Sequence, residues 1–200
     1  MQPILLASSS IYRRELLARL GLAFEYASPD IDESPLANET PDELVARLSI
    51  AKAKALSAKY SQHLIIGSDQ VAVLNNRITG KPHSYERAFE QLRAASGKKV
   101  IFKTGLCLLN ARTGKSQISV EEFEVCFREL KDEQIHHYLT YEQPYDCAGS
   151  FKCEGLGIAL FKELKGNDPN ILIGLPLIRL VDMLTKAGID PLLFASKQTS

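Results

Sequence analysis

Several features are missing from this 200-residue chain, and each absence argues against a class of protein. The chain has 24 basic and 24 acidic side chains, so its formal net charge is zero. A large nucleic-acid footprint normally shows as a basic excess, which disfavours a nucleic-acid-binding domain. The chain also has no Gly-x-Gly-x-x-Gly sequence and no Walker-type loop. These absences argue against a dinucleotide-dependent oxidoreductase and against a P-loop NTPase.

Metal clusters of the zinc type and membrane spans are equally disfavoured. None of the four cysteines forms a Cys-x-x-Cys pair, and no paired histidines follow at zinc-site spacing. No apolar run approaches the roughly 20 residues needed to cross a bilayer. The N-terminus has no basic segment followed by an apolar signal core. We therefore expect a cytoplasmic protein with free thiols. Because tryptophan is absent, Tyr and Phe must supply the aromatic contacts.

The order of apolar patterns predicts a mixed α/β fold. A hydrophobic share of 45% and a charged share of 24% are typical of a globular protein of this length. Strand patterns and helical patterns do not alternate as clean βαβ units, so we expect a mixed sheet flanked by helices. Strands are predicted at 3–7, 24–27, 63–74 (with a short break), 99–110 and 116–128, and residues 158–164 are predicted to form a short strand or a helix. Helices are predicted at 11–20, from Thr40-Pro41 to about 59, and at 84–95, 131–141 and 177–187.

The first strand leads into a serine-rich loop and a helix start. Ser8, Ser9 and Ser10 follow the apolar run, and Arg13 lies in the first turn of the predicted helix. A helix N-terminus presents unpaired N–H groups that suit a phosphate, and arginine adds a planar fork for its oxygens. The alternative is a plain serine N-cap with solvated arginines. On this segment alone the two interpretations are about equally supported.

Two acids and two lysines are further candidates. Asp69 interrupts an apolar strand, where an unpaired carboxylate is costly; it could bind Mg²⁺ or Mn²⁺, or take a proton from water. The alternative for Asp69 is a β-bulge cap. Glu33 taken alone is a solvated loop acid, and Lys52 and Lys81 taken alone are surface lysines. Lys81 nevertheless sits in a rigid Gly-Lys-Pro loop that suits phosphate binding.

The glycine-rich segment 146–155 is the third cluster. Its small residues allow a close approach to a ligand, and Glu154 could accept hydrogen bonds from a base edge. The alternative is a structural turn, with Cys147 and Cys153 as packing thiols.

Taken together, these motifs resemble the Maf family in order and spacing from residue 3 to about 192. The matching segments are Leu6–Leu17, Asp32-Glu33, Lys52-Ala53, Gly67-Ser68-Asp69-Gln70, Gly80-Lys81-Pro82, Thr104-Gly105, Ala148-Gly149-Ser150-Phe151 and Gly174-Leu175-Pro176. The resemblance implies one domain over 1–200 with a Maf/ITPase-like fold. That fold is an elongated mixed sheet flanked by helices, with two lobes around a cleft, often as a homodimer.

The resemblance also implies an activity and a role for each residue. The activity is hydrolysis of a nucleoside triphosphate to a monophosphate and diphosphate with a divalent metal. Asp69 would accept the proton. Ser8, Ser10, Arg13, Lys52 and Lys81 would hold the phosphates, and Glu33 with Asp69 would hold Mg²⁺ or Mn²⁺. No nucleic-acid or membrane partner is implied.

Three departures from the common family pattern bear on the substrate. Tyr12, Gln70 and Glu154 stand where many members have Arg, Thr and Gln, and this triplet resembles the branch that acts on 7-methyl-GTP. Methylated guanine is cationic, so Tyr12 could stack on it and Glu154 could accept from its N–H groups. The alternatives are a dTTP, UTP or CTP pyrophosphatase, and a nucleotide-binding regulator of cell division with weak hydrolysis.

Overall fold

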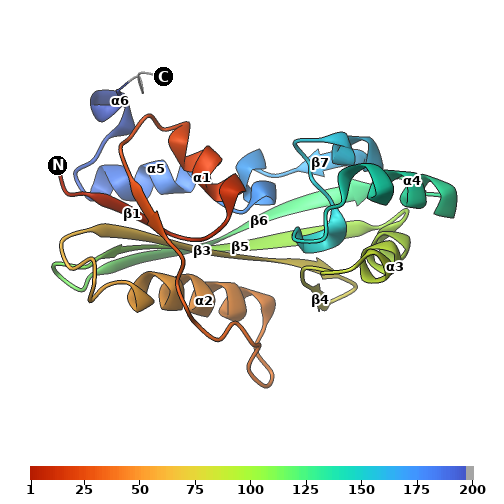
Figure 1. The fold of residues 1–200 in the computed structure, drawn as a ribbon, viewed down its shortest axis with the longest axis horizontal. Coiled ribbons are helices and arrows are strands. Elements are labelled where there is room, and N and C mark those ends of the chain that lie inside the picture. The colour runs from red at the N-terminus through yellow and green to blue at the C-terminus, as the bar shows by residue number, and fades with distance from the viewer. Residues whose placement is uncertain (197–200) are drawn as a thin grey trace. The chain divides into compact units, whose positions relative to one another are not determined.

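The computed structural model describes residues 1–196 (Figure 1). Its strands are β1 (Ile4–Ala7), β2 (Glu25–Ala27), β3 (Leu64–Leu74), β4 (Arg77–Thr79), β5 (Lys99–Asn110), β6 (Ser116–Phe127) and β7 (Phe161–Lys165). Its α-helices are α1 (Ile11–Ala18), α2 (Pro41–Ala55), α3 (Tyr85–Ala95), α4 (Asp132–Glu142), α5 (Leu177–Lys186) and α6 (Pro191–Phe194). Short 3₁₀ helices are η1 (Ala148–Ser150), η2 (Leu156–Leu160) and η3 (Pro169–Ile173).

The strands form a mixed sheet in the order β2-β1-β3-β5-β6-β7, with β4 paired to β3 off this path. β1 pairs in parallel with both β2 and β3, so that Ala7 lies opposite Ala27 and Gly67. β4 pairs antiparallel with the end of β3, and β7 pairs antiparallel with the end of β6. The predicted mixed sheet with helices is therefore confirmed.

The chain divides into two compact units. Unit 1 comprises Met1–Asp69, Thr104–Glu121 and the described part of Gly174–Ser200, and unit 2 comprises Gln70–Lys103 and Glu122–Ile173. The prediction of one domain over 1–200, with a cleft between its lobes, stays a prediction. Residues 197–200 of that range lie outside the described residues.

Unit 1 is built on the parallel strands β1 and β3. All four residues of β1 are buried, as expected of a parallel strand that is covered on both faces. Helix α2 covers one face, and α1 and α5 lie on the other (Figure 1). The core under α2 is made by alternate residues of three strands together with one helix alanine: Leu5, Ala7, Ile65, Cys107, Leu109 and Ala53.

The core of unit 2 contains a cluster of phenylalanine rings, and the chain has no tryptophan. Phe151 lies edge-on against Phe102, Phe127 and Phe161, with ring centroids 4.7–5.9 Å apart. Such edge-to-face pairs stabilise a core beyond the area they bury. Phe151 belongs to the glycine-rich segment 146–155, so the ring cluster anchors that segment to the sheet.

Most predicted elements agree with the structure within a few residues, and three differ. The predicted strand at 63–74 has no break, because β3 runs unbroken through its polar segment. Helix α2 ends at Ala55 rather than near 59, and β7 begins at Phe161 because 156–160 form a 3₁₀ helix. The short strand β4 and the short helix α6 were not predicted. Among the described helices, none has the length and apolar character needed to cross a membrane.

Close helix packing accounts for two glycines of unit 1. A methyl group on Gly67 of β3 would lie 2.0 Å from the backbone oxygen of Ser49, and one on Gly105 of β5 would lie 2.1 Å from that of Val45. Both acceptors belong to α2. The helix therefore approaches the sheet more closely than any side chain at these two positions would allow.

Accordingly, Gly67→Ala and Gly105→Ala should each destabilise the fold by about 1–3 kcal/mol, because the contact is with backbone that must shift. Urea unfolding followed by circular dichroism measures this loss. Gly80→Ala is the matched control, since nothing lies within 4 Å of its added methyl group. Equal midpoints for all three variants would contradict the close packing.

Candidate functional site

Lys52 is the buried centre of a charge cluster in unit 1. It lies in the last turn of α2 and is only 6% exposed. Its Nζ is 2.6 Å from Asp69 Oδ1 and 3.0 Å from Glu33 Oε1. The interpretation of Lys52 as a surface lysine is therefore wrong. One ammonium group brings together two acids that are 36 residues apart in the sequence.

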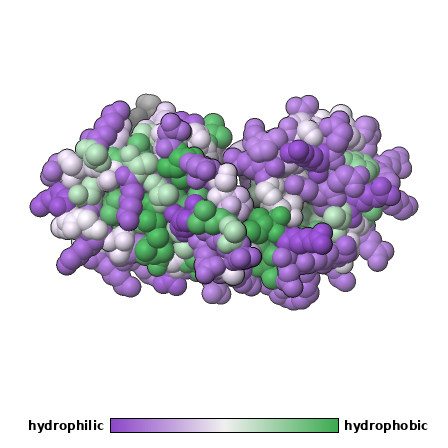
Figure 2. All heavy atoms as spheres, turned by 90° about the horizontal axis from the view of Figure 1, so that it is seen from below, coloured by the Kyte–Doolittle hydropathy of each residue, from purple (hydrophilic) through white to green (hydrophobic). Residues whose placement is uncertain are grey.

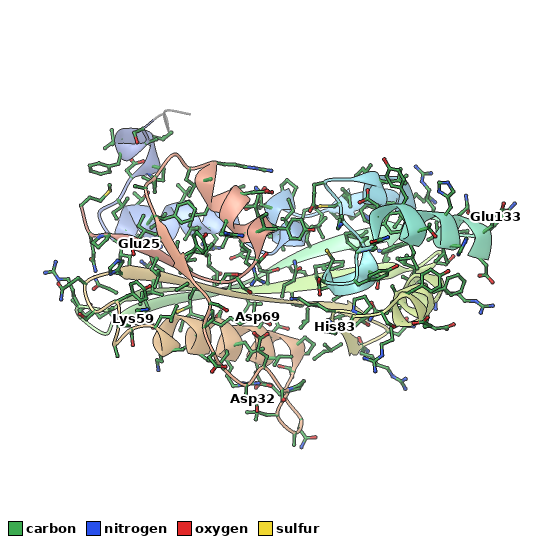
Figure 3. The ribbon with its side chains drawn as sticks, in the orientation of Figure 1. Glu25, Asp32, Lys59, Asp69, His83 and Glu133 are labelled. Atoms are coloured by element: carbon green, nitrogen blue, oxygen red, sulfur yellow. The ribbon has the colours of Figure 1, made fainter. Side chains whose placement is uncertain are left out.

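Asp69 is buried in β3, and its ion pair explains how it is tolerated there. Its side chain is 9% exposed, whereas that of Glu33 is 56% exposed. Figure 3 shows Asp69 where β3 passes over α2. The strand continues past it without a break, and the β-bulge alternative stays a prediction. A buried carboxylate needs a cation or hydrogen-bond donors, and Lys52 supplies both.

The serine-rich loop caps α1, as one of the two interpretations predicted. Ser10 Oγ accepts from the backbone N–H of Arg13 at 3.4 Å, and the buried Ser8 Oγ accepts from the N–H of Ser10 at 3.1 Å. These bonds order the turn that leads into the helix. The capping role does not exclude ligand binding, because the N-terminus of a helix retains a partial positive charge.

Arg13 is held in place by a backbone carbonyl. Its Nε donates to Gly174 O at 2.8 Å, and a methyl group on Gly174 would lie 3.2 Å from that same nitrogen. Burial lowers the pKa of the Arg13 guanidinium, and the charges of Asp69 and Glu33 oppose that lowering. Arginine remains charged despite such a shift. Arg13 is therefore a fixed cation within electrostatic range of the two acids.

Gly174 and Ser68 also belong to this site, although their residue types and positions in the sequence did not by themselves predict it. Ser68 Oγ lies 2.9 Å from Gly174 O and 2.9 Å from Gly105 O, and its one proton can be donated to either. Gly174 has φ +102°, a conformation that favours glycine. Both residues lie inside motifs that carry the family resemblance, and that was the available signal.

Two cations thus lie near two carboxylates in unit 1, which suits an anionic ligand that brings its own metal. Two carboxylates plus substrate phosphates are a common set for Mg²⁺. Glu33 and Asp69 already share one cation, the Lys52 ammonium, so their oxygens lie close enough to converge. Among residues 1–196, no group of three or more His, Cys, Asp or Glu converges on a metal position. The donor set fits a divalent ion that is completed by phosphate and water.

The remaining candidates, Gln70, Lys81 and Glu154, belong to unit 2. Gln70 is half-buried at the start of this unit, and its Nε2 donates to Ile171 O. Lys81 and Glu154 are exposed. The Gly80 carbonyl beside Lys81 accepts from Gln91 Nε2 at 3.2 Å, which ties the Gly-Lys-Pro loop to α3.

Glu154 and Lys81 shift the pKa of the Cys147 thiol in opposite directions. Burial raises the pKa of Cys147 to about 11; the charge of Glu154 raises it further, and that of Lys81 opposes the rise. Burial also raises the pKa of Cys153 to about 12. All four cysteines are free, as predicted, and these two remain thiols at neutral pH.

The fold and the charge cluster define a mixed α/β protein with a candidate site for a phosphorylated ligand. Residues 3–187 match the family model described as Maf-like protein, and the chain belongs to this family. Its sheet and helices are also similar to those of the Ham1 protein of Staphylococcus aureus. That similarity has a TM-score of 0.54 at 13% identity and covers 94% of this chain and 100% of that one.

Curated relatives span nearly the whole chain. A protein of Pseudomonas savastanoi pv. phaseolicola named 7-methyl-GTP pyrophosphatase is 61% identical over 190 residues, which are 95% of this chain and 99% of that one. Proteins with the same name from Nitrosococcus oceani and Pseudomonas aeruginosa are 60% and 58% identical. They align over 92% and 95% of this chain, and over 93% and 99% of their own lengths.

The unequal burial of the three charges predicts unequal effects on stability. Lys52→Met leaves the buried Asp69 carboxylate without its cation, which should cost about 3–5 kcal/mol. Asp69→Asn should cost less, because Lys52 keeps Glu33 as a partner. Urea denaturation of both variants measures the difference. If Asp69→Asn were the less stable of the two, the bridging role of Lys52 would be wrong.

Proposed function

We propose that the protein hydrolyses 7-methyl-GTP to 7-methyl-GMP and diphosphate, and so removes a modified nucleotide. The observation that carries the chemistry is the buried Lys52–Asp69 pair, with Glu33 and Arg13 beside it. The names of relatives near 60% identity support the substrate. A house-cleaning role in nucleotide metabolism goes with this substrate.

In the proposed reaction, water attacks the α-phosphorus of the nucleotide. A new P–O bond forms to the water oxygen, the bond from that phosphorus to the α–β bridging oxygen breaks, and diphosphate leaves. Asp69 accepts the proton of the water. Arg13, Lys52 and Lys81 neutralise the phosphate oxygens, and Ser8 and Ser10 hold the α1 N-terminus against them. Catalysis of this kind depends mainly on positioning and on charge.

A divalent ion belongs to the proposal. Glu33 and Asp69 would hold Mg²⁺ or Mn²⁺, which when bound adds positive charge to the phosphate oxygens. The homodimer and the cytoplasmic location expected from the resemblance also stay predictions.

Base selection is assigned to three residues. Tyr12 is half-buried on α1 and offers an aromatic face to the cationic ring of 7-methylguanine. Glu154 is exposed, and Cys153 Sγ lies 3.5 Å from its Oε2. Its carboxylate accepts from the N1–H and N2–H of guanine. Gln70 stands beside the proton acceptor in the chain and completes the triplet.

The first test is diphosphate release from 7-methyl-GTP, GTP, UTP, dTTP and CTP with Mg²⁺ or Mn²⁺. We expect 7-methyl-GTP to be preferred over GTP, and Glu154→Gln to weaken that preference by about 10–100-fold, because one charge-assisted acceptor is lost. A preference for pyrimidine nucleotides would contradict the proposed substrate but support the proposed hydrolysis reaction. Binding without turnover would favour the nucleotide-binding regulator instead.

The second test concerns the proton acceptor. Asp69→Asn keeps the shape of the side chain and removes its basicity, so kcat should fall by about 100-fold or more while the circular dichroism spectrum is unchanged. Asp168→Asn is a control, since Asp168 is also buried but bonds to Asn170 in unit 2. A kcat for Asp69→Asn within a few-fold of the unsubstituted enzyme would contradict the assignment.

A further inference from the structure

The loop that carries Glu33 has no apolar anchor of its own. Residues 32–38 are all exposed, and Leu36 is 61% exposed. An open hollow beside the loop is lined by Leu36, Ala46, Ile50 and Lys54, among others. Figure 2, which views the molecule from the side of α2, shows apolar side chains at the surface there. The loop is therefore not packed onto α2 by its apolar residues, although Glu33 still contacts Lys52.

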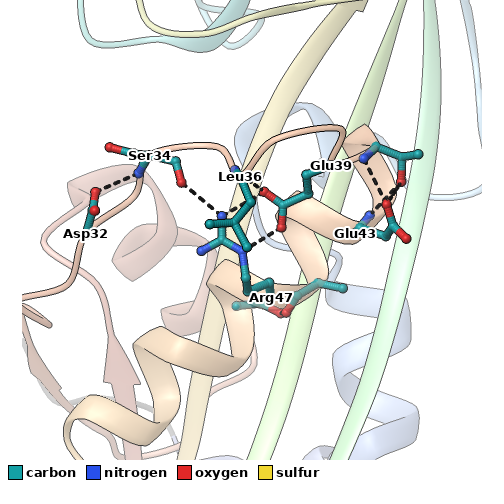
Figure 4. A network of polar contacts seen from close by, with 9 residues as sticks. Asp32, Ser34, Leu36, Glu39, Glu43 and Arg47 are labelled. Atoms are coloured by element: carbon teal, nitrogen blue, oxygen red, sulfur yellow. Dashed lines mark hydrogen bonds and ion pairs between the residues drawn. The ribbon is translucent and has the colours of Figure 1, made fainter.

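A polar clamp fastens this loop to the helix instead (Figure 4). Arg47 of α2 donates through Nε and Nη2 to the two carboxylate oxygens of Glu39, at 2.5 and 2.8 Å. The same Nη2 donates to Ser34 O at 3.0 Å. Ser34 is the residue that follows Glu33. A bidentate arginine pair of this kind has a defined geometry that single surface ion pairs lack.

Hydrogen bonds within the loop connect its other residues to the clamp. Asp32 Oδ1 accepts from Ser34 N at 2.9 Å, and Glu39 Oε2 accepts from Leu36 N at 3.0 Å. Thr40 then begins α2 with a capping box. The Arg47 guanidinium lowers the pKa of Glu39 to about 2, and Glu39 raises that of Arg47, so the pair stays charged at neutral pH.

We propose that Arg47 is a positioning residue that holds Glu33 in place for metal and substrate. Arg47 and Lys52 lie on the same rigid helix, so fixing Ser34 to Arg47 fixes Glu33 relative to Lys52. The proposal rests on the proposed function, because it assigns Arg47 a purpose through Glu33. Arg47 itself hydrogen-bonds to Glu39 and Ser34 and is assigned no part in proton transfer.

The activity test uses Arg47→Gln in the unsubstituted and Glu33→Gln backgrounds, with Mn²⁺ varied during 7-methyl-GTP hydrolysis. We expect the Mn²⁺ concentration for half-maximal rate to rise about tenfold for Arg47→Gln, with kcat within about twofold. The double variant should need no more Mn²⁺ for half-maximal rate than Glu33→Gln alone, because the two changes affect one contact. Arg47→Lys keeps the charge but not the planar fork, so its half-maximal Mn²⁺ concentration should lie between those of the unsubstituted protein and Arg47→Gln.

A second readout is independent of turnover. Hydrogen–deuterium exchange should become faster at Ser34 and Leu36 in Arg47→Gln, while the amides of α2 after the first turn are unchanged. Arg87→Gln, an exposed arginine of α3, is the matched control. Unchanged loop exchange, or multiplicative effects of Arg47→Gln and Glu33→Gln, would overturn the positioning role. If the unsubstituted protein hydrolyses none of the nucleotides, the proposed function fails, and exchange alone then decides the role of Arg47.

Discussion

The ammonium group of Lys52 is the interaction on which the site in unit 1 depends. Two acids from a strand and from a loop are brought to one point because a single buried cation lies between them. Burying that cation alone would be costly. It requires Asp69 to be in β3 at the level of the last turn of α2, and it therefore requires the helix to lie very close to the sheet. Gly67 and Gly105 permit this approach, since any side chain there would meet the helix backbone.

The polar segment of β3 shows how an apolar sheet accommodates buried polar and charged residues. Gly67, Ser68 and Asp69 are all buried in a strand whose preceding residues, 64–66, are apolar. Each is satisfied in a different way. The glycine leaves room for α2, the serine hydroxyl meets backbone carbonyls, and the aspartate meets Lys52. Because no group is left unpaired, the strand does not break, and the charged residue is held by regular secondary structure rather than by a loop.

Features that depend on neighbouring residues were predictable from the sequence, whereas features that depend on distant partners were not. Local patterns predicted the helix starts well, because a cap such as Thr40 acts within three residues of itself. The continuity of β3 could not be predicted locally, since the partners of Ser68 and Asp69 are 17 to 106 residues away. The burial of Lys52 was hidden for the same reason. Arg47 carries no signal at all, because its fork meets Glu39 eight positions earlier across a loop whose path the sequence does not reveal.

On the proposed function, different groups meet the two ends of the substrate. The triphosphate is common to all nucleotides, and its charges are assigned mainly to groups that ion pairs and hydrogen bonds hold in place, such as Lys52 paired with Asp69 and Arg13 bonded to Gly174. The base differs between nucleotides, and it is assigned to Tyr12 and Glu154, which are half-buried and exposed. Substitutions at such positions leave the buried ion pair intact and cost little stability. A new base preference can therefore arise on this scaffold without any change in the charges that perform the hydrolysis.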